Sequence, residues 1–282
     1  MKPLISVIIP TFNRAEFLKI SISSVLNQTF KEFELLIIDD GSTDNTKEII
    51  KSFNDDRIKY IYYNQNKGPS YARNTGIKLA QSNFIAFLDS DDKWKNEKLE
   101  IQYKSMLKNS NYLLSHTEEI WYKNGKILNP KKIHKKQQGD VFQQSLRLCA
   151  ISMSTVMVKK ELFKIVGLFD ENLLVCEDYD MWLRVTARFP VLLISDALTI
   201  KYGGHKDQLS QRFIGMDKFR IYAIEKLINS EILSKEKLKM AIKELEYKSL
   251  IYGKGCIKHN KKEEGEYYLQ LPEKYKKLVF EK

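Results

Sequence analysis

Three carboxylates lie within four residues at positions 89–92 (DSDD), directly after the apolar run 84–88 (FIAFL). Inside a hydrophobic core these carboxylates would repel one another and lose their hydration at high cost. At the end of a buried strand they can face a cleft and share a hard divalent cation, which prefers oxygen ligands. Acidic turns also cap helices. The turn by itself therefore leaves a metal site and a helix cap equally open.

Polar residues also follow two earlier segments that have the composition of buried strands. The apolar run 4–9 leads to Thr11, and the apolar run 33–38 leads into Asp39 and Asp40. Open α/β sheets bind their ligands at the carboxyl ends of the strands. We therefore expect these residues and the acidic turn to meet at one edge of a sheet.

The first 92 residues alternate between strand patterns and helix patterns. Apolar runs predict strands at 4–9, 33–38, 58–62 and 84–88. Helices are expected to start near Asn13, Asp44 and Gly68. Asn13 is followed by Glu16 in the spacing of a capping box, and Pro69 suits the first turn of a helix. The alternation predicts an α/β fold with a mainly parallel sheet and helices on both faces.

The second half of the chain changes character near residue 206. Before it we expect a lysine-rich hairpin or loop at 120–139, a helix after Glu177 that stops before Pro190, and strands at 191–194 and 198–202. After it, strand patterns stop and helices are expected at 212–229, 235–253 and 256–270. Residues 206–282 carry 18 Lys and Arg against 12 Asp and Glu. The chain thus divides into a first domain, 1–205, and a C-terminal helical extension, 206–282.

Composition limits the classes of protein and of partner. The 282 residues are 43% hydrophobic and 29% charged, as in globular proteins, and the net charge of +11 suggests an anionic partner. That partner could be a nucleotide phosphate, a nucleic acid or a membrane surface. Cys149, Cys176 and Cys256 are far apart and form no CxxC pair, which argues against a zinc knuckle or a disulfide framework. The few, scattered cysteines fit a reducing cytosol, so we expect a cytoplasmic protein. No run reaches the ~18 apolar residues of a membrane span, so we expect it to be peripheral to the membrane at most.

Five motifs in a fixed order resemble the family 2 glycosyltransferases, which have the nucleotide-sugar-binding GT-A fold. The motifs are SVIIPTFNR, LLIIDDGSTDNT, NKGPSYARNTGI, FIAFLDSDD and EDYDMWLR, and the resemblance covers about residues 3 to 205. It implies inverting transfer of a hexosyl or N-acetylhexosaminyl group from a nucleotide-diphosphate sugar, with UDP favoured. The acceptor implied is a glycan or a lipid-linked glycan, in bacterial surface polysaccharide biosynthesis.

The resemblance also assigns the donor-binding residues. Asp39 matches the aspartate that accepts a hydrogen bond from uracil, and Thr11 matches the residue beside the base and ribose. Arg73 matches an arginine beside the uracil and the phosphates. Asp89 and Ser90 complete the donor contacts. Without the motif context, capping of the adjacent helices is an alternative role for Thr11 and Asp39. The alternative for Arg73 is a surface ion pair.

A metal site is implied by the same comparison. Asp91 is expected to bind Mn²⁺ or Mg²⁺, and Asp89 to bond the ribose or a metal-bound water. His205 matches a late histidine that can complete the metal shell, although a lone histidine is as often structural. The role of Asp92 stays open.

The acidic pair Glu177 and Asp178 matches the pair that stands ahead of a helix in the family. Asp178 is expected to be the catalytic base, which removes the proton of the acceptor hydroxyl. Glu177 is expected to orient the acceptor or to support Asp178. Acids in a first helical turn also stabilise a helix through its dipole, and this is a very common use.

Three rival functions can be weighed against the sequence. A nicotinamide dehydrogenase needs GxGxxG after the first strand, where this chain has PTFNR. A nucleic-acid binder would explain the charge, but no recognised motif is present, so we expect no nucleic-acid partner. An inactive sugar-binding or scaffolding relative is the serious alternative, and the intact DxD and ED pairs argue against it. The basic C-terminal helices favour a packed helical hairpin over a membrane anchor, with peripheral membrane contact as a further interpretation.

Overall fold

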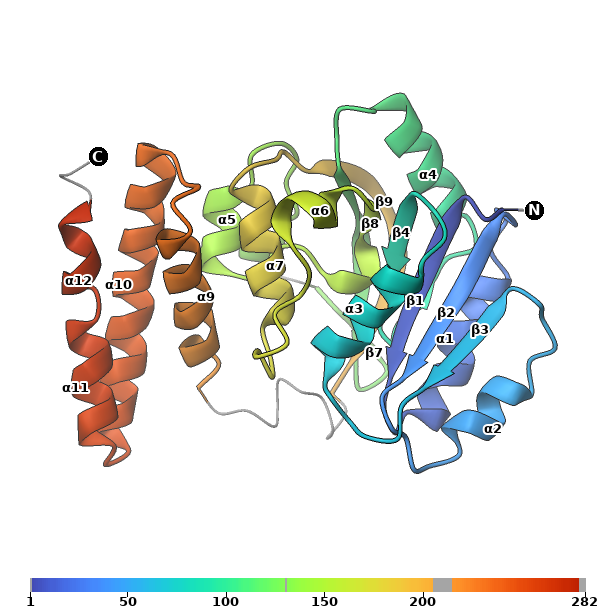
Figure 1. Ribbon diagram of the computed structural model, residues 1–282, viewed down its shortest axis with the longest axis horizontal. Helices are drawn as coiled ribbons and strands as arrows, with labels where there is room; N and C mark the ends of the chain where they lie inside the picture. Colours follow the sequence, from blue (N-terminus) through green and yellow to red (C-terminus); the bar gives the residue numbers. More distant parts are fainter. Residues whose placement is uncertain (1, 130, 205–214, 279–282) are drawn as a thin grey trace. The chain divides into compact units, whose positions relative to one another are not determined.

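A computed structural model describes residues 2–129, 131–204 and 215–278 (Figure 1). The chain forms two compact units. The first, here the sheet unit, comprises Met1–Gly139, Ile151–Leu174 and Pro190–His205. The second, here the helical unit, comprises Asp140–Ala150, Val175–Phe189 and Lys206–Lys282.

The sheet unit is built on one mixed sheet, in which the described residues form nine strands. The strand order is β3-β2-β1-β4-β8-β6-β9-β5, with β7 paired to β6. The strands are β1 (Ile5–Thr11), β2 (Phe33–Asp39), β3 (Ile58–Tyr62), β4 (Phe84–Phe87), β5 (Lys93–Trp94), β6 (Leu114–Lys123), β7 (Lys126–Leu128), β8 (Met157–Lys159) and β9 (Leu192–Gly203).

The predicted α/β fold is confirmed, and its parallel part lies in the N-terminal half. Strands β3, β2, β1 and β4 pair in parallel, as the strand–helix alternation requires. The remaining half is mixed: β8 pairs antiparallel with β4 and β6, whereas β9 pairs in parallel with β6. The two strands expected at 191–194 and 198–202 form the single strand β9, whose pairing with β6 shifts register near Thr117 and Glu118.

Helices cover both faces of the parallel strands. Alternate side chains of β1, such as Val7, share one buried cluster with Leu18 and Ile22 of the first helix. On the other face, a Cβ at Gly76 would come within 2.6 Å of the Ile8 side chain, so the third helix packs closely there. The helical elements of this unit are α1 (Ala15–Leu26), α2 (Thr46–Lys51), α3 (Pro69–Leu79), α4 (Lys98–Lys108), η1 (Lys132–His134), η2 (Met153–Thr155) and α6 (Leu162–Val166).

The start of α1 differs from the prediction that Asn13 caps it. Asn13 has a positive φ of 51°, and its side-chain oxygen accepts a hydrogen bond from the backbone N–H of Thr43. The side chain of Asp44 instead accepts from the N–H of Ala15, at 3.1 Å. A residue from the loop before α2 therefore serves the first turn of α1.

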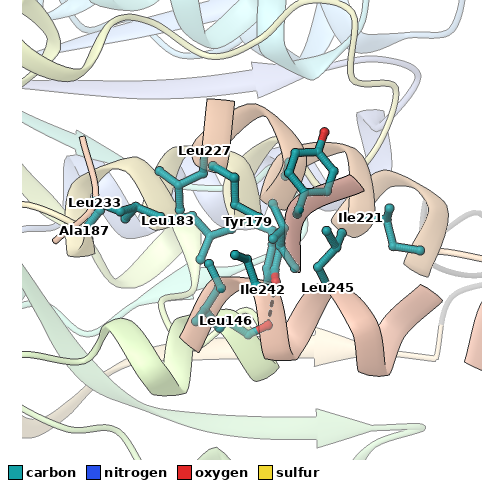
Figure 2. Packing of buried hydrophobic residues seen from close by; sticks show 14 of the residues in the cluster. Leu146, Tyr179, Leu183, Ala187, Ile221, Leu227, Leu233, Ile242 and Leu245 are labelled. Atoms are coloured by element: carbon teal, nitrogen blue, oxygen red, sulfur yellow. Dashed lines mark hydrogen bonds between the residues drawn. The ribbon is translucent and has the colours of Figure 1, made fainter. Parts of the chain in front are cut away.

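The helical unit contains α5 (Phe142–Arg147), α7 (Glu177–Thr186), α9 (Asp217–Asn229), α10 (Lys235–Lys258), α11 (Lys262–Gln270) and α12 (Glu273–Lys276). One hydrophobic cluster joins them (Figure 2). Tyr179 and Leu183 of α7 pack in it with Ile221, Ile242 and Leu245 of the C-terminal helices. The Tyr179 hydroxyl also donates to the carbonyl of Leu146, at 2.5 Å.

The helical C-terminal region is thus present, and α7 and α5 share its core. The helical unit also includes residues 140–150 and 175–189, which lie before the predicted extension. The assignment of 1–205 as one domain stays a prediction. In the part of the chain that the structure describes, no helix combines the length and apolar character needed to cross a membrane.

Candidate functional site

Three strand ends of the sheet unit meet at one edge. Thr11 ends β1 and is the register partner of Asp39, which ends β2. The N–H of Leu88, directly after β4, donates to the carbonyl of Ile8 in β1. The acidic turn 89–92 therefore begins at the same edge, because parallel strands present their carboxyl ends on one side.

Asp39 is a fully buried acceptor at this edge. One carboxylate oxygen accepts from the backbone N–H of Ser42 at 2.9 Å, and the other from the hydroxyl of Tyr60 at 2.8 Å. Burial and the bond to Asp39 raise the pKa of Tyr60, so the phenol keeps the proton that it donates. Each carboxylate oxygen has a second lone pair, which can accept from a ligand N–H.

Asp40 has a structural role in the loop ahead of α3. Its carboxylate accepts from the backbone N–H groups of Lys67 and Gly68, the latter at 2.7 Å. Gly68 has a φ of +92°, which a residue with a side chain rarely adopts. Burial raises the pKa of Asp40. This carboxylate orients the start of the helix that carries Arg73.

Arginines reach the two more accessible carboxylates of the acidic turn. Arg73, 5% exposed, donates to Asp89 at 2.8 Å, and Arg14 lies 3.8 Å from Asp91. The side chains of Asp89 and Asp91 are 29% and 20% exposed. Burial and the neighbouring charge of Asp89 raise the pKa of Asp91. Two negative groups are thus held close together, which favours a cation near them.

Ser90 and Asp92 make hydrogen bonds within the protein that hold the turn in place. Asp92 is 2% exposed, and its carboxylate accepts from the hydroxyl of Ser154 at 2.6 Å. The carbonyls of Ser90 and Asp92 both lie within hydrogen-bond distance of the Ser21 hydroxyl on α1, at 2.8 and 2.7 Å, and its single hydrogen can be donated to either. Ser90 is itself 8% exposed. The side chain of Asp92 therefore anchors the turn.

The carboxylate oxygens at this edge fit a hard divalent cation whose remaining ligands come from a substrate. Among the residues with a described structure, no three acidic, histidine or cysteine side chains cluster as a protein-only metal site. Asp89 and Asp91 supply two carboxylates, however, and Mg²⁺ sites commonly combine one or two carboxylates with substrate phosphates and water. His205, the predicted additional ligand, lies outside the described residues.

The second acidic pair occupies the first turn of α7 in the helical unit. Asp178 accepts from its neighbour's backbone N–H, that of Tyr179, at 2.7 Å and from the thiol of Cys149 at 3.1 Å. Glu177 is 6% exposed. The preceding residue, Cys176, has a positive φ of 62°, and burial with the charge of Asp178 raises its thiol pKa to about 12. The thiol of Cys176 therefore stays protonated.

The structure brings Thr11, Asp39, Arg73 and the acidic turn together, whereas Glu177 and Asp178 belong to the other unit. Sequence reasoning missed Tyr60 and Ser154. The hydroxyl of Tyr60 on β3 donates to the carboxylate of Asp39 on the neighbouring strand β2. Ser154 contacts a turn more than 60 residues away in the chain. Neither contact has a local pattern that could reveal it.

Comparisons with known proteins identify the family of the chain. The model of the family described as "Glycosyl transferase family 2" matches residues 6–164, a range that includes the acidic turn and ends before α7. An uncharacterized glycosyltransferase of Rickettsia conorii is 45% identical over 187 residues, which are 65% of this chain and 30% of that protein. The chain thus spans less than a third of the length of three rickettsial relatives.

A relative of similar size and a solved structure extend the comparison. The Escherichia coli protein named UDP-Glc:alpha-D-GlcNAc-diphosphoundecaprenol beta-1,3-glucosyltransferase WfgD is 37% identical over 220 residues, which are 77% of this chain and 81% of that protein. The crystal structure of S. aureus TarS in complex with UDP-GlcNAc has the same fold, with a TM-score of 0.72. It is 23% identical and covers 86% of this chain and 71% of that chain. The chain belongs to glycosyl transferase family 2.

Proposed function

We propose that the chain is a metal-dependent, inverting glycosyltransferase that uses a UDP-sugar. The observation that carries the proposal is the Arg73–Asp89 pair, at 2.8 Å, at the sheet edge that also holds Thr11 and Asp39. The name of the E. coli relative supports a UDP-sugar donor and a lipid-diphosphate-linked acceptor. A hexosyl or N-acetylhexosaminyl group would then pass to a glycan or lipid-linked glycan in bacterial surface polysaccharide synthesis.

The uracil base of the donor would be recognised at the ends of β1 and β2. Asp39 is fixed by Ser42 and Tyr60 as an acceptor, and uracil offers an N–H donor of matching character. Thr11, whose hydroxyl makes no hydrogen bond within the described residues, would contact the base or ribose. A nucleobase without a donor at that position would leave the remaining lone pairs of this buried carboxylate without a partner, which would weaken binding.

The diphosphate would lie against Arg73 and the acidic turn. A guanidinium binds phosphate oxygens through a planar fork of donors, and Arg73 is held in place by its bond to Asp89. Asp91 and Asp89 would hold Mn²⁺ or Mg²⁺, with Ser90 as a further donor contact. A bound cation would neutralise the charge that develops on the departing nucleoside diphosphate. His205 remains a candidate ligand.

The proposed catalytic base is Asp178. Asp178 would accept the proton of the acceptor hydroxyl as its oxygen attacks the anomeric carbon opposite the diphosphate, which inverts the configuration. The S–H of Cys149 and the N–H of Tyr179 hold that carboxylate. Glu177 would orient the acceptor.

A lipid-linked acceptor would bring the protein to the cytoplasmic face of a membrane. The residues 247–258 of α10 contain no acid. Their exposed side chains are Tyr247, Leu250, Ile251, Lys254, Ile257 and Lys258. At helical spacing these side chains form one face, here the α10 face, that mixes apolar and basic groups. Such a face suits an anionic lipid surface, because it offers both apolar burial and electrostatic attraction.

Calorimetric titration with UDP, in Mn²⁺ and in EDTA, tests the donor site. UDP should bind tightly only with Mn²⁺, and Asp91→Asn should lose about tenfold or more of that metal-dependent affinity while staying folded. Asp56→Asn, at an exposed loop carboxylate, is the matched control. Equal UDP affinity with and without metal in the wild-type protein would remove the metal assignment, and tighter binding of GDP than of UDP would remove the uracil assignment.

A further inference from the structure

We infer that Ser154, outside the ligand-contacting residues named above, is the positioning residue that gives the acidic turn its binding shape. This inference rests on the proposed donor site. Ser154 lies in η2 of the sheet unit and is fully buried. Its hydroxyl oxygen accepts from the backbone N–H of Asp89 at 3.0 Å and donates its hydrogen to the carboxylate of Asp92 at 2.6 Å.

One side chain thus joins the first and last residues of the turn. A hydroxyl has one hydrogen and two lone pairs, so both bonds can form at once. The turn has a bond of its own, from the N–H of Asp92 to the carbonyl of Asp89 at 3.0 Å. With Asp92 held inward by Ser154, the carboxylates of Asp89 and Asp91 are the ones left with access to solvent and to a ligand.

Ser154 is itself held through its backbone carbonyl. Its carbonyl accepts from the indole N–H of Trp94 at 2.7 Å and from the hydroxyl of Thr199 at 3.1 Å. Trp94 and Thr199 are both fully buried. The hydroxyl of Ser154 is therefore presented to the turn by a rigid part of the core, as supporting residues are presented to metal ligands in other proteins.

The effect expected from this geometry is on metal binding. Residues that orient metal ligands typically cost about 10- to 100-fold in metal affinity when they are removed. Ser154→Ala deletes both bonds to the turn and leaves the carboxylates of Asp89 and Asp91 intact. We expect the Mn²⁺-dependent gain in UDP affinity to fall by about tenfold or more, with UDP affinity in EDTA unchanged. A loss of folding stability alone would not alter the ratio of these two affinities.

Ser152→Ala is the matched control, because Ser152 is two residues away and its hydroxyl donates to Glu119 at 2.8 Å instead of to the turn. Titrations with UDP in Mn²⁺ and in EDTA, with circular dichroism for folding, compare both variants with the wild-type protein. Ser154→Cys keeps a weak donor and serves if Ser154→Ala does not fold, with a smaller loss expected. Supporting results are a reduced Mn²⁺ gain in the Ser154 variant and an unchanged gain in Ser152→Ala.

Two outcomes separate this inference from the proposed function. The role of Ser154 is overturned if a folded Ser154 variant keeps the wild-type gain in UDP affinity with Mn²⁺, or if that gain falls equally in Ser152→Ala. Either result leaves the proposed donor site intact. A wild-type protein whose UDP affinity does not respond to Mn²⁺ overturns the metal site itself, and the inference with it.

Discussion

At the scale of single residues, the aspartates have different roles, and the groups around each carboxylate determine which role it has. Asp39 is a buried acceptor, Asp40 holds a loop, and Asp92 anchors a turn through Ser154. Asp91 keeps a partly exposed carboxylate. The number and direction of the donors around each carboxylate, more than its place in a motif, separate candidate ligand contacts from structural bonds.

Asp178→Asn tests the proposed base. The amide is nearly isosteric and its oxygen can still accept from Tyr179 or Cys149, so α7 should stay folded. Removing a general base typically costs about 10²–10⁴ in rate. We expect sugar transfer to fall by that factor with UDP-sugar affinity unchanged, measured with a radiolabelled donor once screening has found an acceptor. A normal rate in Asp178→Asn with a loss in Glu177→Gln would move the base to Glu177, and normal rates in both would leave the pair as a helix cap.

His116 gives the sheet unit a predicted sensitivity to acid. Its Nε2 faces the carbonyl of Gln137 at 3.0 Å, and burial together with the charge of Lys136 lowers the pKa of His116 to about 3, although Glu119 opposes this. In the unfolded chain the pKa is about 6.5, so the unfolded state binds the extra proton between those values. Stability is therefore full above about pH 6.5 and is lost as the pH falls toward 3.

Urea unfolding at pH 7.5, 5.5 and 4.5 measures this loss. The contribution of His116 should amount to a few kcal/mol at the acid end, at about 1.4 kcal/mol per pKa unit. His116→Gln keeps a donor for Gln137 but does not titrate, so its stability should decline less steeply with acid. His259→Gln, at an exposed histidine, is the control. An acid slope in His116→Gln as steep as that of the wild-type protein would contradict the prediction.

At the scale of elements, helices and strands are completed by distant segments. Asp44, ahead of α2, accepts from the first turn of α1, and η2 supplies the residue that closes the turn after β4. The helix α10 buries one face, through Leu238, Ile242 and Leu245, in the cluster of the helical unit. Its opposite face is the exposed α10 face.

The α10 face should bind anionic lipid. Each lysine near an anionic membrane contributes about 1 kcal/mol, so reversing Lys254 and Lys258 to Glu should weaken binding to phosphatidylglycerol vesicles by about tenfold or more. Lys47→Glu with Lys51→Glu on α2 makes the same change in net charge at exposed lysines of the sheet unit and should have a much smaller effect. Vesicle co-sedimentation compares the two double variants. Equal losses of vesicle binding in both double variants would show that only net charge matters, and the α10 face would no longer be a candidate membrane contact.

At the scale of the whole molecule, the two units divide the proposed work. The described residues of the proposed donor site all lie in the sheet unit, and the acidic pair lies in the helical unit. The helix that carries Glu177 and Asp178 buries Tyr179 and Leu183 against α9 and α10, which follow it by some 30 residues or more (Figure 2). The C-terminal helices therefore complete the core that supports the proposed base.

A chain that ends at residue 230 should lose that support. Removing Leu238, Ile242 and Leu245 takes three buried side chains from one cluster, and single losses of this kind cost about 2–5 kcal/mol. We expect fast hydrogen exchange along α7 and loss of transfer, with UDP binding retained by the sheet unit. Hydrogen exchange of the full and shortened chains, with UDP titration, measures both. Protection of α7 equal to that in the full chain would show that the C-terminal helices are a separate module.

The sequence by itself determined the α/β fold and the edge at which the polar residues gather. The alternation of strands and helices follows from local features of the sequence, namely apolar periodicity and turn residues. Parallel strands then bring Thr11, Asp39 and the acidic turn to one edge of the sheet. The roles of these residues in catalysis stay predictions. Only the tertiary structure decided that Ser154 closes the acidic turn, that Asp44 serves α1, and that α7 shares a core with the C-terminal helices. These contacts join segments far apart in the chain. They depend on how whole elements pack, and the local pattern of residue types does not show that packing.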